Sequence, residues 1–264
     1  MLTGFLGGGK MAEALMRGLL EKGGRAPDAL GVSDVNPARL AELQASYGVK
    51  VFETNLALAS ESDSVILAVK PQELGVVLTE IASGVSGKTV ISIAAGRTLS
   101  FLEAGLPEAR IVRAMPNLAC QAGEGMTALC GGQMAGEEDL AKARAVFSCS
   151  GAVVMCAESQ FDWVTAVSGS GPAFWTQLCA YEVEAAVASG MDDATARLLV
   201  LQTMLGTAKV LLDGGLAFDG FMEAVASKGG TTAAGLAVLR ESRAREILGS
   251  VLEAAAQRSR ALRS

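Results

Sequence analysis

The first fourteen residues constrain the fold most, because a short apolar run leads into three glycines and then into a helical pattern. As a strand, a turn and a helix, Gly7, Gly9 and Ala12 match the G-x-G-x-x-A pattern of a turn that binds a dinucleotide. The first glycine permits the turn, the second lets a pyrophosphate approach the backbone, and the alanine lets the helix pack closely on the strand. The free N–H groups and positive dipole end of the helix suit that anion. Glycine-rich turns are common, so the rest of the chain must decide whether a cofactor binds here.

Composition limits the classes of function. The chain has 264 residues, half of them hydrophobic, and a formal net charge of −6. This length predicts about one and a half to two domains with a large core, and the acidic balance disfavours a nucleic-acid groove. No apolar run approaches the roughly 18 residues of a membrane helix, and no basic leader precedes the first apolar residues. We therefore expect a soluble, cytoplasmic protein with no nucleic-acid or membrane partner.

The chain contains no histidine, and its five cysteines form no C-x-x-C pair. The cysteines, which are typical of scattered buried thiols, are Cys120, Cys130, Cys149, Cys156 and Cys179. The absence of histidine excludes a Ser-His-Asp triad, a Cys-His pair and every His-ligated metal site. We expect no metal, and proton chemistry must use a carboxyl, Lys, Tyr, Thr, Ser, a thiol, water or the substrate.

A second strand is predicted at residues 30–34, after a helix that Gly23 and Gly24 end. Asp34 lies 22 residues beyond Ala12, near the offset at which a carboxylate meets the adenosine ribose hydroxyls. Alternatively, Asp34 caps the helix that begins near Pro37. Arg39 either pairs with a ribose 2′-phosphate or is a solvated helix residue.

Short apolar runs continue to alternate with helical segments and predict further strands. They lie at residues 49–52, 64–69, 89–93, 110–114 and 153–156. This alternation favours an α/β fold, with a Rossmann-type, mostly parallel sheet and helices on both faces. Strand ends face the ligand in such sheets, so Lys70 is expected at the cofactor edge, and the small residues Ala94, Ala95 and Gly96 let a flat nicotinamide approach.

The periodicity becomes helical beyond about residue 158. Helices are predicted at 161–189, 192–212, 218–227 and 231 to the end, separated by glycines. We therefore expect a dinucleotide-binding Rossmann domain at 1–157 and an all-helical second domain at 158–264, whose role in substrate binding and dimerisation is implied only by the family resemblance given below. The segment 195–212 is apolar around much of its circumference, which favours burial against a second subunit.

Six motifs occur in an order that resembles the pyrroline-5-carboxylate reductase family over essentially the whole chain. They are GGGKMA from residue 7, AVKPQ from 68, ISIAAG from 91, RAMPN from 113, VSGSGPAF from 167 and GGTTAAGL from 229. The resemblance implies a Rossmann domain and a helical domain interlocked with its twin in a dimer, and often larger rings of dimers. It also implies reduction of the C=N bond of 1-pyrroline-5-carboxylate to L-proline, the last step of proline synthesis, with NADPH or NADH.

The resemblance also implies site residues, carried over position by position. The cofactor would meet Leu6, Gly7, Gly8, Gly9, Lys10, Met11, Asp34, Asn55, Ala68, Val69, Lys70, Pro71, Ala94, Ala95 and Gly96. The substrate would meet Met115, Pro116, Asn117, Ser227, Gly229, Gly230, Thr231 and Thr232, with Thr232 and Thr231 as the catalytic residues. The Thr232 hydroxyl would hydrogen-bond the substrate, including its ring nitrogen.

The chain departs from the family pattern at a few positions. Lys10 stands where Asn is usual, Ala119 where a proline follows Met-Pro-Asn-Thr, and Lys228 where the substrate loop has proline. An arginine common in the family at the position of Val35 is absent. Asp34 favours NADH, whereas family habit favours NADPH.

The residues themselves allow this chemistry. Gly229 to Thr232 precede a helical run, so free N–H groups, a dipole end and hydroxyls suit a carboxylate, with ordinary helix capping as the alternative. Hydride addition to an imine needs no strong base, which suits a chain without histidine. A β-hydroxyacid dehydrogenase is disfavoured because Trp175 replaces its catalytic lysine. Another cyclic-imine reductase and a non-catalytic nicotinamide-binding regulatory protein remain alternatives.

Overall fold

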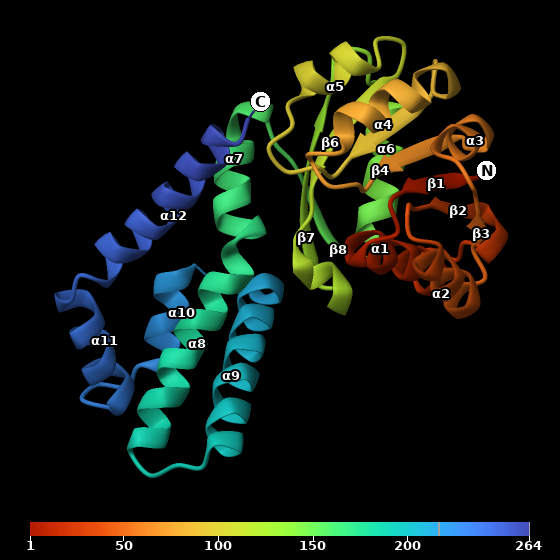
Figure 1. Ribbon diagram of the computed structural model, residues 1–264. Helices are drawn as coiled ribbons and strands as arrows, with labels where there is room; N and C mark the ends of the chain where they lie inside the picture. The colour runs from red at the N-terminus through yellow and green to blue at the C-terminus, as the bar shows by residue number, and fades with distance from the viewer. Residues whose placement is uncertain (216, 264) are drawn as a thin grey trace. The chain divides into compact units, whose positions relative to one another are not determined.

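The structure is a computed structural model that describes residues 1–215 and 217–263. It divides into two compact units (Figure 1). The sheet unit comprises Met1–Pro172 and the residues from Glu253 onward, and the helical unit comprises Ala173–Leu252. The domain boundary expected between residues 157 and 158 remains a prediction, because compactness divides the chain at other positions.

The sheet unit is built on one eight-stranded sheet of order β3-β2-β1-β4-β5-β6-β7-β8. The strands are β1 (Thr3–Leu6), β2 (Leu30–Ser33), β3 (Lys50–Val51), β4 (Ser64–Leu67), β5 (Thr89–Ser92), β6 (Arg110–Met115), β7 (Gly125–Gly131) and β8 (Gly151–Met155). All neighbouring pairs are parallel except β6 and β7. The strand order reverses between β1 and β4, which is where a doubly wound sheet binds its ligand.

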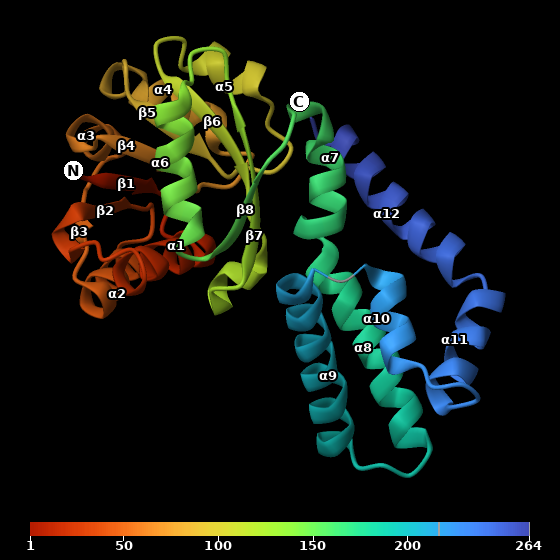
Figure 2. The ribbon, with the colours of Figure 1, turned by 180° about the vertical axis from the view of Figure 1, so that it is seen from behind.

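Helices cover both faces of this sheet (Figures 1 and 2). One apolar cluster joins the sheet to α1 (Lys10–Glu21), α2 (Pro37–Tyr47) and α6 (Glu137–Ser148). A second joins it to α3 (Asn55–Glu61), α4 (Leu74–Ile81) and α5 (Leu99–Gly105). The strands β1, β2, β4 and β5 are buried at every position, as parallel strands between two helical layers should be. The expected mostly parallel Rossmann-type sheet is confirmed.

Strand β7 is an element that the sequence interpretation missed. It pairs antiparallel with β6, placing Met115 opposite Ala128, and parallel with β8. Its short run of mixed small and apolar residues gives little local signal, and the direction of pairing depends on partners distant in sequence.

The C-terminal helices are α7 (Phe161–Val164), α8 (Gly171–Ala188), α9 (Asp193–Gly214), α10 (Phe218–Val225), α11 (Thr231–Glu241) and α12 (Ala244–Ala261). The prediction of a single last helix from residue 231 is wrong, because the helix is interrupted at Ser242. Its hydroxyl donates to the Leu239 carbonyl and accepts from the Ala244 N–H, so it caps the start of α12. A π-helical turn at Thr165–Gly169 separates α7 from α8.

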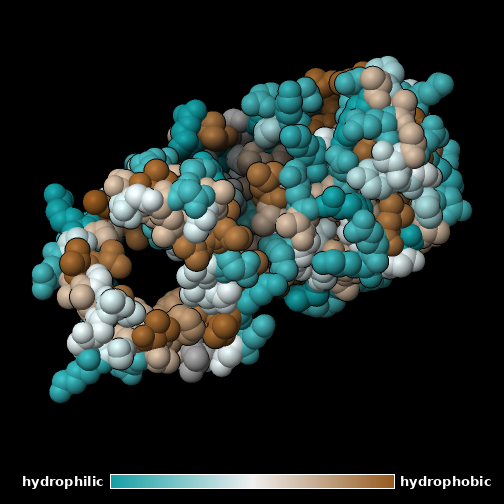
Figure 3. All heavy atoms as spheres, turned by 90° about the horizontal axis from the view of Figure 1, so that it is seen from below, coloured by the Kyte–Doolittle hydropathy of each residue, from teal (hydrophilic) through white to brown (hydrophobic). Residues whose placement is uncertain are grey.

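The helical unit buries little of its own apolar surface. Its exposed large side chains include Trp175, Tyr181, Leu198, Leu199, Leu201, Leu205 and Leu212. Figure 3 shows brown, hydrophobic surface over the helical part, at the left of the view. By length and composition alone α9 is long and apolar enough to cross a membrane, with only 6% of its most apolar window buried. That test is weak for one helix, because a soluble helix that packs on other protein passes it as well.

Candidate functional site

The glycine turn after β1 has a conformation that requires glycine at its first position. Gly7 adopts φ +97°, and a Cβ there would stand 2.8 Å from the Ala68 carbonyl oxygen. Its N–H donates to the Ser33 carbonyl at 2.8 Å. The turn therefore lies between the ends of β2 and β4, at the reversal of strand order, as the fingerprint predicted.

Gly9 differs from Gly7, because the protein itself does not require a glycine there. Gly9 has φ −65° and ψ 176°, which any residue adopts, and no atom lies within 4 Å of the Cβ it lacks. It precedes α1 as the N-cap with no side chain capping the helix. The open space and the free N–H groups of the first turn fit a pyrophosphate.

Lys10 is the exposed first residue of α1. Together with Glu13, Ala14, Arg17 and Gln121 it lines a surface hollow of about 300 Å³. Its ammonium group adds positive charge at the end of the helix where the dipole is already positive. Met11 is half-buried against the core.

Asp34 follows β2 and is held by the backbone of two turns. One carboxylate oxygen accepts the Gly8 N–H at 2.7 Å, and the other accepts the Asn36 N–H at 2.9 Å. The alternative role as cap of α2 is wrong for Asp34, because the Asn36 side chain caps that helix by accepting from the Ala38 N–H. The carboxylate thus stands beside the glycine turn, where a ribose is expected.

Arg39 is neither solvated nor free. Its Nε donates to the Gly8 carbonyl at 2.7 Å, and its two terminal nitrogens pair with Glu13 and Glu42. The guanidinium lowers the pKa of Glu13, helped by a hydrogen bond from the Tyr47 hydroxyl. Arg39 therefore fastens α2 to α1 and to the glycine turn.

The other predicted cofactor residues lie at the ends of strands or helices in the sheet unit. Ala68 and Val69 follow β4 half-buried, and Lys70 is exposed. The Asn55 side chain accepts from Ser33 and donates to Glu80, so protein partners already hold it. Gly96 has φ +74°, and a Cβ there would stand 3.0 Å from the Leu262 carbonyl oxygen. Within the expected nicotinamide edge, Gly96 is thus packed against Leu262, whereas Ala95 is exposed.

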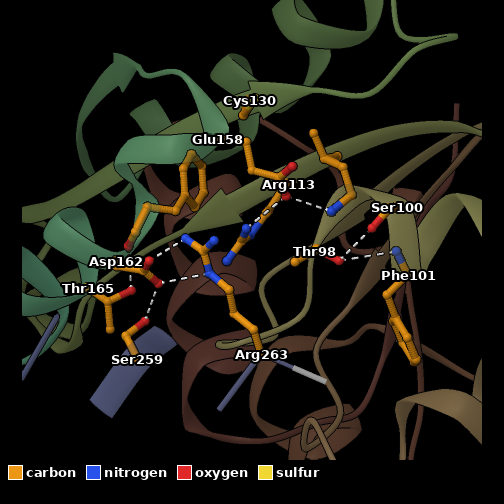
Figure 4. A network of polar contacts seen from close by, with 12 residues as sticks. Thr98, Ser100, Phe101, Arg113, Cys130, Glu158, Asp162, Thr165, Ser259 and Arg263 are labelled. Atoms are coloured by element: carbon orange, nitrogen blue, oxygen red, sulfur yellow. Dashed lines mark hydrogen bonds and ion pairs between the residues drawn. The ribbon is translucent and has the colours of Figure 1, made fainter. Parts of the chain in front are cut away.

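A partly buried network of polar side chains lies near the C-terminal end of the described chain (Figure 4). Glu158 accepts from Arg113 at 2.8 Å and from the Leu99 N–H at 2.6 Å. Asp162 accepts from Ser259 at 2.8 Å and pairs through both oxygens with Arg263. Burial lowers the pKa of Arg113, although the hydrogen bond to Glu158 acts in the opposite direction. The Arg113 guanidinium stacks on the Phe161 ring, with its Cζ 4.5 Å from the ring centroid.

This network joins β6, α5, α7 and α12, and the sequence interpretation gave none of its members a role. Each of its residues is an ordinary charged or hydroxyl residue in the sequence, and Arg113 and Glu158 are 45 positions apart. No local pattern connects residues at such separations, so only the fold brings them together.

Met115 is the last residue of β6, and Pro116 and Asn117 follow it in the sheet unit. The Asn117 amide donates to Ser168 and its oxygen accepts the Met126 N–H at 3.1 Å. The Met115 methyl group packs against Gly169, where a Cβ would be 2.7 Å away. Asn117 therefore fastens the end of β6 to the π-helical turn, and its predicted substrate role remains a prediction.

The predicted substrate turn belongs to the helical unit. Gly229 has φ +70°, and Gly230 is the N-cap of α11, with no side chain capping the helix. The Gly230 N–H donates to the Ser227 carbonyl at 3.0 Å. Thr231 and Thr232 are the first two residues of α11, exposed and half-buried respectively. The alternative of a threonine as the cap is wrong, and an uncapped helix start can accept a carboxylate.

Comparison with known proteins gives concordant results for both parts of the chain. Residues 158–262 match the family described as pyrroline-5-carboxylate reductase dimerisation, and residues 3–96 match NADP oxidoreductase coenzyme F420-dependent. The pyrroline-5-carboxylate reductase of Methanosarcina acetivorans is 41% identical over 98% of this chain and 97% of its own length.

Solved structures agree along the whole length. A pyrroline-5-carboxylate reductase from Coxiella burnetii has a TM-score of 0.95 at 32% identity, covering 99% of this chain and 98% of that one. The Plasmodium falciparum pyrroline carboxylate reductase, solved with NADP bound, has a TM-score of 0.88 at 28% identity, covering 100% and 98%.

Proposed function

The chain belongs to the pyrroline-5-carboxylate reductase family, and on that premise we propose that it reduces the C=N bond of 1-pyrroline-5-carboxylate to L-proline with hydride from NADPH or NADH. The observation that carries this proposal is the 41% identity to a reductase of that name over 98% of the chain. A β-hydroxyacid dehydrogenase or a non-catalytic nicotinamide-binding protein is not favoured by this similarity.

The sheet unit holds the cofactor in this proposal. The N–H groups at the start of α1 and the open space over Gly9 receive the pyrophosphate, and Asp34 receives the adenosine ribose. Ala68 to Pro71 and Ala94 to Gly96 line the nicotinamide end. The bound reduced nicotinamide supplies the hydride, and the small residues at this edge allow a flat ring to approach the backbone.

The helical unit holds the substrate carboxylate at Gly229, Gly230, Thr231 and Thr232. The uncapped N–H groups of α11 bind the anion, and the Thr232 hydroxyl hydrogen-bonds the ring nitrogen. An iminium brings its proton from solution, so no enzymic base is required. Catalysis is then mainly positioning of the substrate ring rather than acid–base chemistry.

We also propose that the chain acts as a homodimer with interlocked helical units, which assembles further into a ring of dimers in the cytoplasm. The exposed apolar residues of α8 and α9 support an extensive interface, because such surface is costly to leave in water. The match to a dimerisation family supports oligomerisation itself.

The reaction is tested by following the absorbance of reduced nicotinamide with three mixtures. We expect oxidation of the reduced cofactor with 1-pyrroline-5-carboxylate, no reduction of the oxidised cofactor with a β-hydroxyacid, and no change in absorbance without substrate. Identification of proline as the product completes the assay. Cofactor binding without oxidation by any cyclic imine would refute the enzymatic proposal and favour a binding protein.

A further inference from the structure

The residues around the expected adenosine ribose bear on a choice that the proposed function leaves open. NADPH differs from NADH by one phosphate on the 2′-hydroxyl, with a charge of about −1.5 to −2 near neutral pH. A protein that prefers NADPH offers this phosphate a cation, whereas one that prefers NADH offers the free hydroxyls a carboxylate. Both kinds of side chain, Asp34 and Arg39, occur here within one short segment.

The structure commits Arg39 to other partners. Its side chain is only 18% exposed, and all three of its nitrogens contact acceptors: Gly8, Glu13 and Glu42. Arg39 is paired with Glu13 and Glu42, and two further cations, Lys10 and Arg17, line a surface hollow together with Glu13. A phosphate arriving beside Asp34 would meet the negative charge of that carboxylate, and Arg39 would have to leave two carboxylates to bind it.

Asp34 is by contrast poised as an acceptor. The Gly8 and Asn36 N–H groups fix each of its oxygens, at 2.7 and 2.9 Å. An ionised carboxylate has about four acceptor positions, so each oxygen retains capacity for one further donor. Two adjacent ribose hydroxyls are a donor pair of that kind. The neighbouring Val35 is 94% exposed and brings no charge to the surface beside Asp34.

We propose that this chain selects NADH over NADPH, with Asp34 as the acceptor of the free ribose hydroxyls and the pairing of Arg39 with Glu13 and Glu42 withholding the cation that a 2′-phosphate needs. The proposal rests on the proposed function, since it concerns the cofactor of that same site. It differs from the preference for NADPH that the resemblance to the family implies.

Equilibrium binding of the two reduced cofactors to the purified enzyme, followed by nicotinamide fluorescence without substrate, tests the preference. We expect the Kd for NADH to be lower by about tenfold or more, the change that one additional like-charge contact produces. The ratio should shrink as salt screens the repulsion. Equal affinity, or tighter binding of NADPH, would overturn the proposal.

Two variants test whether the charges at positions 34 and 35 determine the preference between NADH and NADPH. Asp34→Asn keeps the side-chain volume and removes the charge, so the NADH to NADPH ratio should narrow by about tenfold. Val35→Arg adds a cation beside the site without touching the hydrogen bonds of Asp34, and it should tighten NADPH binding by about tenfold while NADH changes little. Asp28→Asn, an exposed carboxylate elsewhere in the sheet unit, is the control and should leave the ratio unchanged.

The cofactor-binding measurements test the cofactor preference independently of the proposed reaction. Because Asp34 also fixes the glycine turn, a poorly folded Asp34→Asn variant leaves Val35→Arg to decide, and an unchanged ratio in Val35→Arg would then refute the charge argument. An NADH preference without turnover of 1-pyrroline-5-carboxylate would refute the proposed function and leave this inference intact. Turnover with a preference for NADPH would do the reverse.

Discussion

Asp162 and Arg263 form an ion pair whose removal should lower the free energy of unfolding by an amount that can be worked out from the structure. The side chain of Asp162 is 4% exposed and that of Arg263 is 32% exposed, so one partner is buried and the other reaches water. Ser259 adds a third hydrogen bond to the carboxylate at 2.8 Å. The two changes that break the pair, Arg263→Met and Asp162→Asn, should therefore differ in cost.

The magnitude follows from what each change leaves behind. Arg263→Met leaves a buried carboxylate with Ser259 as its remaining hydrogen-bond donor, near the lower end of the 3–5 kcal/mol typical of a broken buried pair, so about 3 kcal/mol. Asp162→Asn leaves an arginine that can turn into solvent, and it should cost about 2 kcal/mol, as for the loss of charged hydrogen bonds. In the double variant no buried charge is left unpaired, so its cost should be about 3 kcal/mol rather than about 5 kcal/mol.

Urea unfolding of the four proteins, at one protein concentration because assembly contributes to stability, measures this cycle. Arg260→Met, in the last turn of α12 and three residues before Arg263, is the matched control. It breaks the Arg260–Glu253 pair, whose side chains are 43% and 42% exposed, and should cost less than about 1 kcal/mol. Costs of Arg263→Met and Asp162→Asn that add within about 0.5 kcal/mol in the double variant would refute the argument that the pair acts as one buried unit.

Three further expectations concern the site and the sheet. Gly9→Ala should weaken cofactor binding and leave the thermal unfolding midpoint almost unchanged, because only a ligand needs the space over Gly9. Gly7→Ala should lower the unfolding midpoint, because an alanine there would have a strained φ and a close contact with Ala68. Equal effects of the two variants on the unfolding midpoint would contradict this contrast. Thr232→Ala should lower turnover far more than cofactor affinity in parallel rate and binding measurements, and unchanged turnover would remove Thr232 from the proposed chemistry. Burial opposes ionisation of Asp139, yet hydrogen bonds from Thr89, Arg110 and Gly136 outweigh it and lower its pKa. This stabilisation is present above the unfolded pKa of about 3.9 and is lost as the pH falls through the lower folded value, so unfolding free energies of Asp139→Asn should depend less steeply on pH below about 4 than those of the parent; equal slopes would exclude that role.

The elements with strong local patterns were predictable from the sequence. The buried runs that became β2, β4 and β5 are short and mostly apolar, and glycines separate the helices from α8 to α11. The start of α11 at Thr231 was also predictable, because two glycines precede a helical run. These features depend on residues within a few positions of each other.

Features that depend on distant partners were not predictable. The antiparallel pairing of β7 with β6, the contact of Asn117 with Ser168 across 51 positions and the clamp of Arg39 on Glu13 all arise from packing. For Asp34 the sequence left two roles open, and only the structure shows that Asn36 is the cap of α2. Local patterns therefore located the cofactor turn, but not the charges that surround it.

The sheet unit is assembled from two separated stretches of the chain, Met1–Pro172 and the residues from Glu253 onward. During synthesis the ribosome releases the glycine turn first, and Leu262 and Arg263 emerge only after all of the helical unit. Until then the turn at Gly96 lacks the contact with Leu262, and Asp162 lacks Ser259 and Arg263. The sheet unit therefore reaches its native packing around Asp162 and Gly96 only after translation has passed residue 263.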